Sequence, residues 1–184
     1  MSQLPDWVKL AQEQWNWRGA TRPPFAVVPN ASQISVWDFP RPPKYVEDCR
    51  QVVICFNGQE IARTKNAILV LETSHPPSFY IPPKDINFKF LKPSTGNSFC
   101  EWKGPAQYWD INDGVNQLKK VAWSYAQPFD EAKMIADHIA FYPTQLHCTV
   151  DGEQVLPQPS GFYGGWVTPE LVGPFKGEPG SESW

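Results

Sequence analysis

Few side chains in this 184-residue chain stand out as acids, bases or nucleophiles. Cys100 could attack a substrate if a base lay close, because the thiolate is the reactive form of cysteine. His138 lies in the apolar sequence IADHIAFY, where an isolated histidine usually serves as a structural hydrogen-bond donor. Glu72 ends the apolar run AILVLE and would be a proton-transfer group if it faced Lys103 or His138. The candidate catalytic residues are therefore Cys100, His138 and Glu72, and each has a purely structural alternative.

A second chemical signal is the concentration of aromatic residues in CEWKGPAQYW (100–109) and AWSY (122–125). Alternation along a strand would place Val121, Trp123 and Tyr125 on one face of their strand. In the other segment it would place Trp109 and Tyr108 on opposite faces. Such rings form either a packed core or an aromatic cage around a flat or cationic small molecule. Lys103 before Gly104 favours the cage, because a lysine beside a glycine turn can bring a charge to the mouth of a concave surface. The residues predicted to bind the ligand are Trp102, Lys103, Tyr108, Trp109, Trp123 and Tyr125, with Glu72 and His138 as further polar contacts.

The motifs of several large enzyme classes are missing. Neither GxGxxG nor GxxxxGK[ST] occurs, so a nucleotide-phosphate cradle has no support. The sequence also lacks HExxH, a GxSxG elbow and any cluster of histidines and cysteines, and we expect no metal and no cofactor. The formal net charge of −3 argues against a nucleic-acid or acidic-membrane partner.

The cysteines and the N-terminal residues indicate in which cellular compartment the protein is expected. Cys49, Cys55, Cys100 and Cys148 are scattered without a CxxC pair. Residues 1–20 are interrupted by charged residues and a proline, which is unlike a secretory signal peptide. No stretch approaches the roughly 18 to 20 apolar residues of a membrane-spanning helix. These features predict reduced thiols, no membrane span and a cytoplasmic location.

The elements that must position these residues are mostly strands. QVVICF and QEIARTKNAILVLE flank Asn57-Gly58, which suits a type I′ hairpin turn because both residues tolerate positive φ. Further hairpins are expected around Asp113-Gly114 and Asp151-Gly152. NFKFL alternates like a half-buried strand, and a turn is expected at residues 95–97. The sequence therefore predicts a mainly β, antiparallel domain built from hairpins over residues 46–156.

Two short helices are expected beside the strands. Residues 4–18 place apolar side chains at near-helical spacing, with Asp6 as the N-cap and Gly19 closing the helix. PFDEAKMIADHIAF (128–141) predicts one internal helix, because acidic residues lie at its N-terminal end and Pro143 follows it.

Proline is used about twice as often as in ordinary proteins, with 20 residues in the chain. We expect residues 1–45 to be an N-terminal helix with an extended proline-rich arm. Residues 157–184 are expected to form a C-terminal strap rich in proline, glycine and aromatic residues. Such segments either wrap their own domain or dock on a partner, since proline-rich chains lose little entropy on binding. For the strap we favour packing on its own domain.

Several segments occur together in the order typical of a known family. They are VWDFPRPP (36–43), IARTKNAILVLETSHPPSFYIPPKDI (61–86), FCEWKGPAQYW (99–109), AWSYAQP (122–128) and IADHIAFYPTQLHCTVDGE (135–153). Over most of residues 36–153 the chain resembles the domain of unknown function 427 family. With the tail GFYGGWVTPELVGPFKG (161–177), its longer layout is similar to members from cyanobacteria and other oxygenic phototrophs.

The resemblance implies a compact domain of the β-tent type, in which antiparallel sheets meet at an angle. Methionine-sulfoxide reductases of the B class and the imide-binding domain of cereblon share that architecture. Relatives in that fold often hold a structural zinc with two CxxC pairs, so their absence here implies a metal-free variant. Ligand pockets of β-tent proteins lie on the sheet surface, which implies Tyr80, His75 and His138 as further pocket walls.

Two functions from different classes remain open. The first is binding of an unknown small molecule in an aromatic-lined pocket of the β domain, with catalysis undecided. The alternative is a protein-interaction or assembly factor that contacts a protein partner through the proline-rich and aromatic arms. The residues alone identify neither the ligand nor a reaction.

Overall fold

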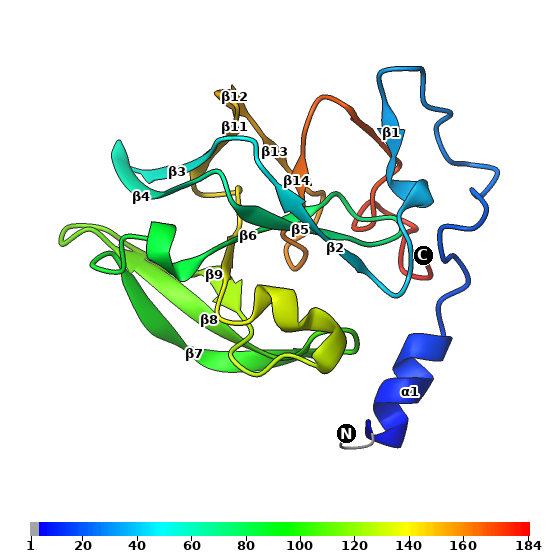
Figure 1. The fold of residues 1–184 in the computed structure, drawn as a ribbon, viewed down its shortest axis with the longest axis horizontal. Helices are drawn as coiled ribbons and strands as arrows, with labels where there is room; N and C mark the ends of the chain where they lie inside the picture. Colours follow the sequence, from blue (N-terminus) through cyan, green and yellow to red (C-terminus); the bar gives the residue numbers. More distant parts are fainter. Residues whose placement is uncertain (1–3) are drawn as a thin grey trace.

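The computed structural model describes residues 4–184, and most of their regular structure is β-strand (Figure 1). Adjacent strands in the two main sheets run antiparallel. This arrangement confirms the predicted fold class, a mainly β structure built from antiparallel hairpins.

Two main sheets make up the β structure. The larger sheet has the strand order β2-β5-β6-β10-β9-β8-β7, and the smaller sheet has the order β12-β11-β3-β4. The strands of the larger sheet are β2 (Lys44–Asp48), β5 (Ala67–Leu71), β6 (Ser78–Ile81), β7 (Leu91–Cys100), β8 (Gly104–Asn112), β9 (Gln117–Ser124) and β10 (Ile139–Phe141). Those of the smaller sheet are β3 (Val52–Phe56), β4 (Gln59–Thr64), β11 (His147–Val150) and β12 (Glu153–Gln154).

The remaining elements are short. Two small sheets pair β1 (Ile34–Ser35) with β15 (Leu171–Val172) and β13 (Leu156–Pro157) with β14 (Trp166–Val167). The helices are the α-helix α1 (Asp6–Glu13) and the 3₁₀ helices η1 (Val36–Asp38), η2 (Pro83–Asp85) and η3 (Asp130–Ile135). Within residues 4–184 no helix is both long enough and apolar enough to cross a membrane.

The predicted hairpin turns lie where the sequence places them. Asn57 and Gly58 join β3 to β4 with φ of +48° and +74°, the two positive values that a type I′ turn requires. Asp151 and Gly152 join β11 to β12 in the same way, with φ of +49° and +87°.

The main hydrophobic core lies between the two sheets. In Figure 1 the smaller sheet lies above β7, β8 and β9, and apolar side chains of both sheets form one buried cluster. Ile54 and Ile61 from the smaller sheet and Ile81 and Ile111 from the larger sheet are completely buried. A second cluster contains Tyr80, Trp123 and Tyr125 and packs against η3, so the larger sheet is apolar on both faces.

Several predicted boundaries before residue 100 are wrong. α1 has Pro5 at its N-cap with Asp6 as its first residue, and it ends at Glu13 rather than at Gly19. The strand expected at NFKFL begins only at Leu91. The turn expected at residues 95–97 is instead an irregularity inside β7, where the register with β8 shifts between Pro93 and Asn97.

The internal helix is also shorter than predicted. Only Asp130–Ile135 is helical, while Ile139–Phe141 form β10 in the middle of the larger sheet. Asp137 has a φ of +60°, which ends the helical path before these apolar residues enter the sheet. His138 therefore precedes a strand instead of lying at the end of a helix.

Val121 does not share a face with Trp123 and Tyr125, contrary to the alternation pattern. Val121 packs in the core between the sheets, whereas the two aromatic residues belong to the cluster on the opposite face. The preceding Lys120 has a φ of +51° and the register with β8 shifts there, so a bulge breaks the alternation.

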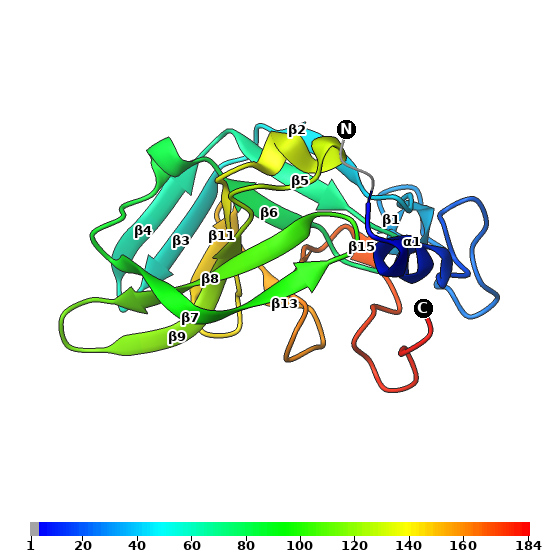
Figure 2. The same ribbon diagram turned by 90° about the horizontal axis from the view of Figure 1, so that it is seen from below.

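The N-terminal arm (residues 4–45) and the C-terminal tail, the strap of residues 157–184, pack against each other. Figure 2 shows α1, β1, β15 and the C-terminal end together at one end of the molecule. Trp37 in η1 is completely buried, and its indole N–H donates to the carbonyl oxygen of Pro174 at 3.1 Å. The Trp37 ring also packs edge-on against Trp17 and Trp184. The division of the chain at residues 45/46 and 156/157 into arm, domain and strap stays a prediction.

The tail also enters the main core through Trp166. This side chain is completely buried, stacks on Phe79 with 4.8 Å between ring centroids, and donates from its indole N–H to the carbonyl oxygen of Phe141 at 2.8 Å. Four residues earlier, Phe162 is 60% exposed.

We expect Trp166→Ala to lower the free energy of unfolding by about 3–5 kcal/mol, because a large buried ring is replaced by a cavity. Phe162→Ala is the matched control and should change it by less than about 1 kcal/mol. Urea denaturation of both variants measures this difference. Equal stabilities would show that the tail does not pack in the core as described.

Candidate functional site

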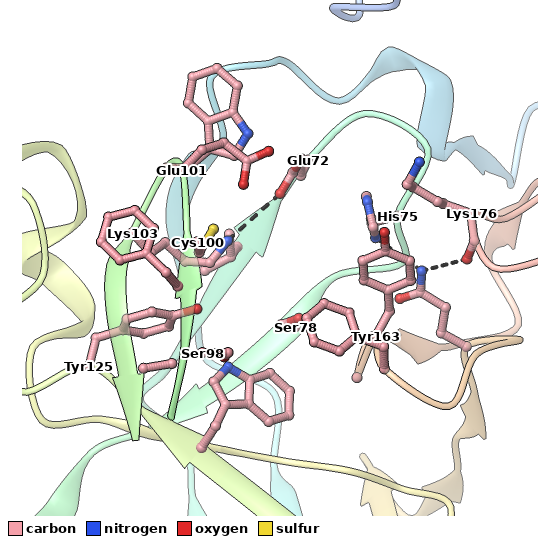
Figure 3. A pocket seen from close by; sticks show the side chains of 18 of the residues that line it. Glu72, His75, Ser78, Ser98, Cys100, Glu101, Lys103, Tyr125, Tyr163 and Lys176 are labelled. Carbon is pink, nitrogen blue, oxygen red and sulfur yellow. Dashed lines mark hydrogen bonds and ion pairs between the residues drawn. The ribbon is translucent and has the colours of Figure 1, made fainter. Parts of the chain in front are cut away.

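A cavity of about 340 Å³ lies on the face of the larger sheet opposite the main core. Strands β5 to β9 supply its floor, α1 supplies Trp7 and Ala11, the segment after α1 supplies Trp15, and the tail supplies Tyr163 and Lys176. Figure 3 shows Lys103 and Tyr125 on one side of this space and His75, Tyr163 and Lys176 on the other. Segments far apart in the sequence therefore enclose one space.

Aromatic rings make up much of the cavity wall. Trp123 donates from its indole N–H to the hydroxyl oxygen of Tyr80 at 2.9 Å, and the two rings meet edge to face. Tyr142 packs against Trp123 with 4.5 Å between centroids, and the Tyr125 ring lies 6.4 Å from that of Tyr80. These contacts hold the rings in place around the cavity.

Gly164 allows the tail to approach this aromatic wall. A Cβ atom at this position would lie 2.3 Å from the Trp123 ring, well inside van der Waals contact. A Cβ at Gly165 would lie 2.5 Å from both the Gln158 side-chain oxygen and the Pro76 carbonyl oxygen. The Gly-Gly pair is therefore required for the tail to close over the cavity as it does.

The turn between β7 and β8 brings charge and thiol chemistry to the cavity. Cys100 pairs with Gly104 across this turn, and Gly104 has a φ of +95° that favours glycine. The backbone carbonyl oxygen of Lys103 accepts from the N–H of Phe129, which fixes the turn to the segment before η3. Burial raises the pKa of the Cys100 thiol although Lys103 opposes this shift, so Cys100 is a neutral thiol at neutral pH.

Glu72 lies between two cations at the edge of the cavity. Its Oε1 atom is 3.3 Å from Arg41 Nε and its Oε2 atom is 3.7 Å from Lys103 Nζ. The side chains are largely withdrawn from solvent, with exposures of 15% for Glu72, 11% for Lys103 and 0% for Arg41. Such a cluster tolerates burial only while each cation keeps its contact with the carboxylate.

The charges of this cluster are maintained by one another. Burial opposes the charge on Glu72, but attraction by Lys103 and Arg41, joined by His75 once its ring is protonated, outweighs it and lowers the pKa of Glu72. Burial likewise opposes the charge on Lys103, but attraction by the Cys100 thiolate, which forms only at high pH, and by the Glu72 carboxylate outweighs it and raises the pKa of Lys103. At neutral pH, where Cys100 is a neutral thiol, Glu72 is the charged partner. Burial lowers the pKa of Arg41 despite Glu72, yet a guanidinium stays protonated at neutral pH.

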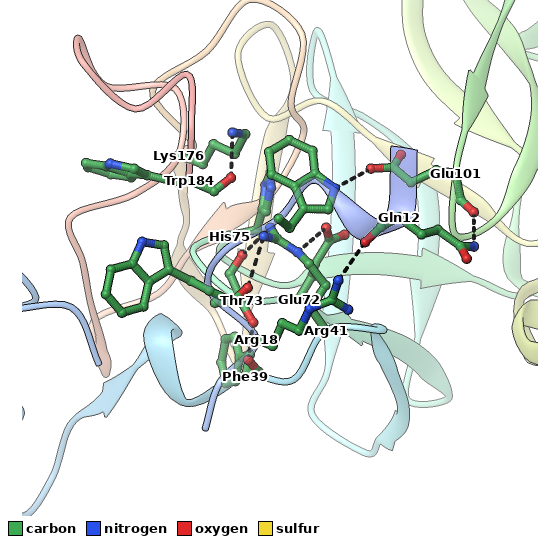
Figure 4. Close-up of polar contacts among 12 residues, drawn as sticks. Gln12, Arg18, Phe39, Arg41, Glu72, Thr73, His75, Glu101, Lys176 and Trp184 are labelled. Carbon is green, nitrogen blue, oxygen red and sulfur yellow. Dashed lines mark hydrogen bonds and ion pairs between the residues drawn. The ribbon is translucent and has the colours of Figure 1, made fainter. Parts of the chain in front are cut away.

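Arg41 also ties distant parts of the backbone together. Figure 4 shows its side chain among Glu72, Thr73 and Phe39. Its Nη2 donates to the Thr73 carbonyl oxygen at 2.9 Å and its Nη1 to the Trp17 carbonyl oxygen at 3.3 Å. The N-terminal arm is thereby fixed to the segment that follows β5.

Trp15 attaches the segment after α1 to the cavity. Its indole N–H donates to Glu101 Oε1 at 2.9 Å, and the charged groups of Arg41 and Lys176 lie 4.7 Å and 4.5 Å from its ring centroid. Gln12 adds a hydrogen bond of 2.6 Å to the carbonyl oxygen of Glu101. These contacts give a physical reason for the early end of α1, because Trp15 must leave the helix to reach Glu101.

The side-chain amide of Gln158 determines the protonation of His75. Its oxygen accepts from the N–H of Gly165, so its nitrogen donates to the Lys176 carbonyl oxygen at 2.7 Å and to His75 Nδ1 at 3.0 Å. Because Nδ1 must accept, the proton of the neutral imidazole is on Nε2. Burial lowers the pKa of His75 to about 4, which agrees with a neutral ring.

The structure brings most of the predicted site residues together. Around the cavity lie Glu72, His75, Tyr80, Cys100, Trp102, Lys103, Tyr108, Trp123 and Tyr125. Trp109 and His138 are not among the lining residues. Trp109 packs on the main core and donates to Ser124 Oγ at 2.8 Å, and His138 Nδ1 lies 2.9 Å from the Ala136 carbonyl oxygen.

Other lining or supporting residues were missed by the sequence reasoning. They come from the two flanking segments and include Trp15, Arg41, Gln158, Tyr163 and Lys176. The Gly-Gly pair of the tail was the one sequence signal for a close approach to another surface. Within residues 4–184, no group of three or more His, Cys, Asp or Glu side chains is arranged to hold a metal ion.

The sequence profile of a family described as Domain of unknown function (DUF427) matches residues 44–153. The chain belongs to this family. The matched DUF427 domain runs from β2 into β12 and contains the floor of the cavity and the turn with Lys103. Both α1 and the tail lie outside the match, although both line the cavity. A comparison with curated proteins found no match.

We expect Glu72→Gln to lower the free energy of unfolding by about 3–5 kcal/mol, because Arg41 and Lys103 would stay buried without their counterion. The matched control is Asp38→Asn, which removes the partner of Arg22 in an ion pair with side-chain exposures of 38% and 43%. Asp38→Asn should lower the free energy of unfolding by about 1 kcal/mol or less. Urea denaturation compares them, and equal losses would contradict the assigned role of Glu72.

We expect His75 to make the protein less stable as the pH falls from 6.5 towards 4. The pKa of His75 is lowered from 6.5 to about 4 in the folded state, so the unfolded chain takes up the proton first and is favoured in this window. The free energy of unfolding should fall between pH 7 and pH 5, and His75→Gln should make this fall smaller by about 1–2 kcal/mol. Urea denaturation at both pH values measures it, and identical losses in both proteins would refute the neutral buried imidazole.

Proposed function

We propose that this protein binds a flat small molecule in the cavity on the outer face of the larger sheet. The observation that supports this best is a 340 Å³ cavity with aromatic walls and a charged group, Lys103, in the adjoining turn. This volume falls at the lower end of the range for small-molecule sites.

The arrangement of the walls favours a planar ligand. Tyr80, Trp123 and Tyr125 are held by contacts with one another, so they form a preorganised apolar surface rather than mobile side chains. Rigid aromatic walls reduce the entropy lost on binding. The predicted ligand contacts at Trp109 and His138 are not part of this proposal, since neither residue lines the cavity.

Catalysis stays undecided. Glu72 and Lys103 form a buried pair that could exchange a proton with a ligand, whereas the neutral Cys100 thiol is a poor nucleophile. The β-tent assignment, the similarity to cyanobacterial members and the cytoplasmic location stay predictions.

The alternative function, protein interaction through the flanking arms, has weaker support. Trp37 and Trp166, which made the arms candidates for partner contact, are completely buried in the chain's own packing. Their aromatic surface is therefore already used within the molecule.

A thermal-shift screen against a metabolite library tests the proposal, with nucleotides, cyclic imides and pigment precursors included. A ligand should raise the melting temperature of the wild type by several degrees. Ala11→Phe places a ring into the cavity from α1, and we expect it to weaken binding at least tenfold. The matched control is Leu10→Phe on the same helix, since Leu10 is 67% exposed and does not line the cavity.

A ligand that stabilises the Ala11 and Leu10 variants equally would bind elsewhere and overturn the proposal. If no compound stabilises the wild type although all three proteins are well folded, the result would contradict small-molecule binding and favour the protein-interaction function.

A further inference from the structure

The turn between β7 and β8 offers more hydrogen-bond donors to the cavity than the protein itself uses. The Lys103 ammonium is the main one. Its ionic partner Glu72 Oε2 is 3.7 Å away, beyond hydrogen-bond distance, although the Lys103 side chain is only 11% exposed. Among residues 4–184 this ammonium has an ion pair with Glu72 and no hydrogen bond, which leaves its three N–H groups for another acceptor.

A second unused donor adjoins it in the same turn. Trp102 lines the cavity with 6% exposure, and within the described part of the chain its indole N–H has no hydrogen-bond partner. A buried N–H without an acceptor is unfavourable, so an acceptor brought by a ligand would stabilise it.

The Tyr125 hydroxyl is directed into the same space. In Figure 3 it is on the side of the cavity where Lys103 and Cys100 lie. Burial raises the pKa of Tyr125 well above its ordinary value, so the group is an O–H donor at neutral pH. The Nε2–H of neutral His75 adds a donor to the cavity lining.

The two carboxylates that line the cavity, Glu72 and Glu101, already have partners. Both oxygens of Glu72 face cations, Arg41 on one side and Lys103 on the other. Glu101 Oε1 accepts the indole N–H of Trp15. A cationic ligand would have to compete with these contacts, whereas a ligand with acceptor oxygens would find donors without partners.

We propose that the ligand is a planar organic acid, whose carboxylate accepts hydrogen bonds from Lys103 Nζ and the Tyr125 hydroxyl while its ring packs against the surface that Tyr80 and Trp123 form together. This inference rests on the proposed function and adds the chemical class of the ligand. It also replaces the cationic alternative that the aromatic residues alone allowed.

Three probes with the same naphthalene ring, substituents of similar size and different charge test the inference: 2-naphthoate, 2-naphthamide and 2-naphthylmethylamine. Binding is measured by calorimetric titration of the full chain at pH 7. We expect the carboxylate to bind at least tenfold tighter than the amide and the ammonium compound to bind most weakly, because only the carboxylate forms charge-assisted hydrogen bonds with Lys103.

Two variants attribute the preference to the assigned groups. Lys103→Met should abolish the advantage of the carboxylate over the amide. Tyr125→Phe keeps the ring and removes only the hydroxyl, so it remains informative if the lysine variant does not fold, and it should reduce carboxylate affinity severalfold. The matched control is Tyr45→Phe, since Tyr45 has a buried hydroxyl without a partner in residues 4–184 but does not line the cavity.

Equal affinities for the three probes, or tightest binding of the ammonium compound, would overturn the acid preference. So would a carboxylate preference that survives both Lys103→Met and Tyr125→Phe. If none of the probes binds while the library screen yields a ligand that Ala11→Phe excludes, the acid preference is wrong and the proposed function stands. If both experiments yield no ligand, both proposals fail.

Discussion

The buried carboxylate of Glu72 and its two cations organise the region around the cavity. Arg41 belongs to the N-terminal arm, Glu72 follows β5, and Lys103 lies in the turn between β7 and β8. An ion pair withdrawn from water is stable only when its geometry is maintained, so these three segments cannot move independently without exposing an uncompensated charge. The ion pairs of Glu72 therefore fix the relative positions of these three backbone segments.

Trp15 extends this constraint to the ends of the described chain. Its ring contacts the charged groups of Arg41 and Lys176, and Lys176 in turn donates to carbonyl oxygens of Ser181, Glu182 and Trp184. The N-terminal segment, the sheet and the tail are therefore connected by a continuous series of polar and cation–π contacts. Removing any one segment would leave charged or aromatic groups of the others without partners.

Local sequence rules predicted the hairpins, because Asn57-Gly58 and Asp151-Gly152 favour positive φ in any context. They did not predict β10, since IAF suits a helix or a strand and only its place between β6 and β9 decides. Most aromatic residues of the cavity and Lys103 were found because they are concentrated in two short segments, 100–109 and 122–125, and because Lys103 precedes a glycine turn. Arg41 and Gln158 were missed because their roles depend on partners 31 and 83 residues away in sequence, Glu72 and His75.

The family profile ends before the tail begins, yet the cavity uses side chains from both flanking segments. The flanking segments that line the cavity can therefore change in evolution independently of the sheet. The same domain with other flanks would keep the floor and the Lys103 turn but enclose a space of different size and depth. Under the proposed function, exchange or loss of the two ends would change which ligand fits, without any change to the strands that determine the fold.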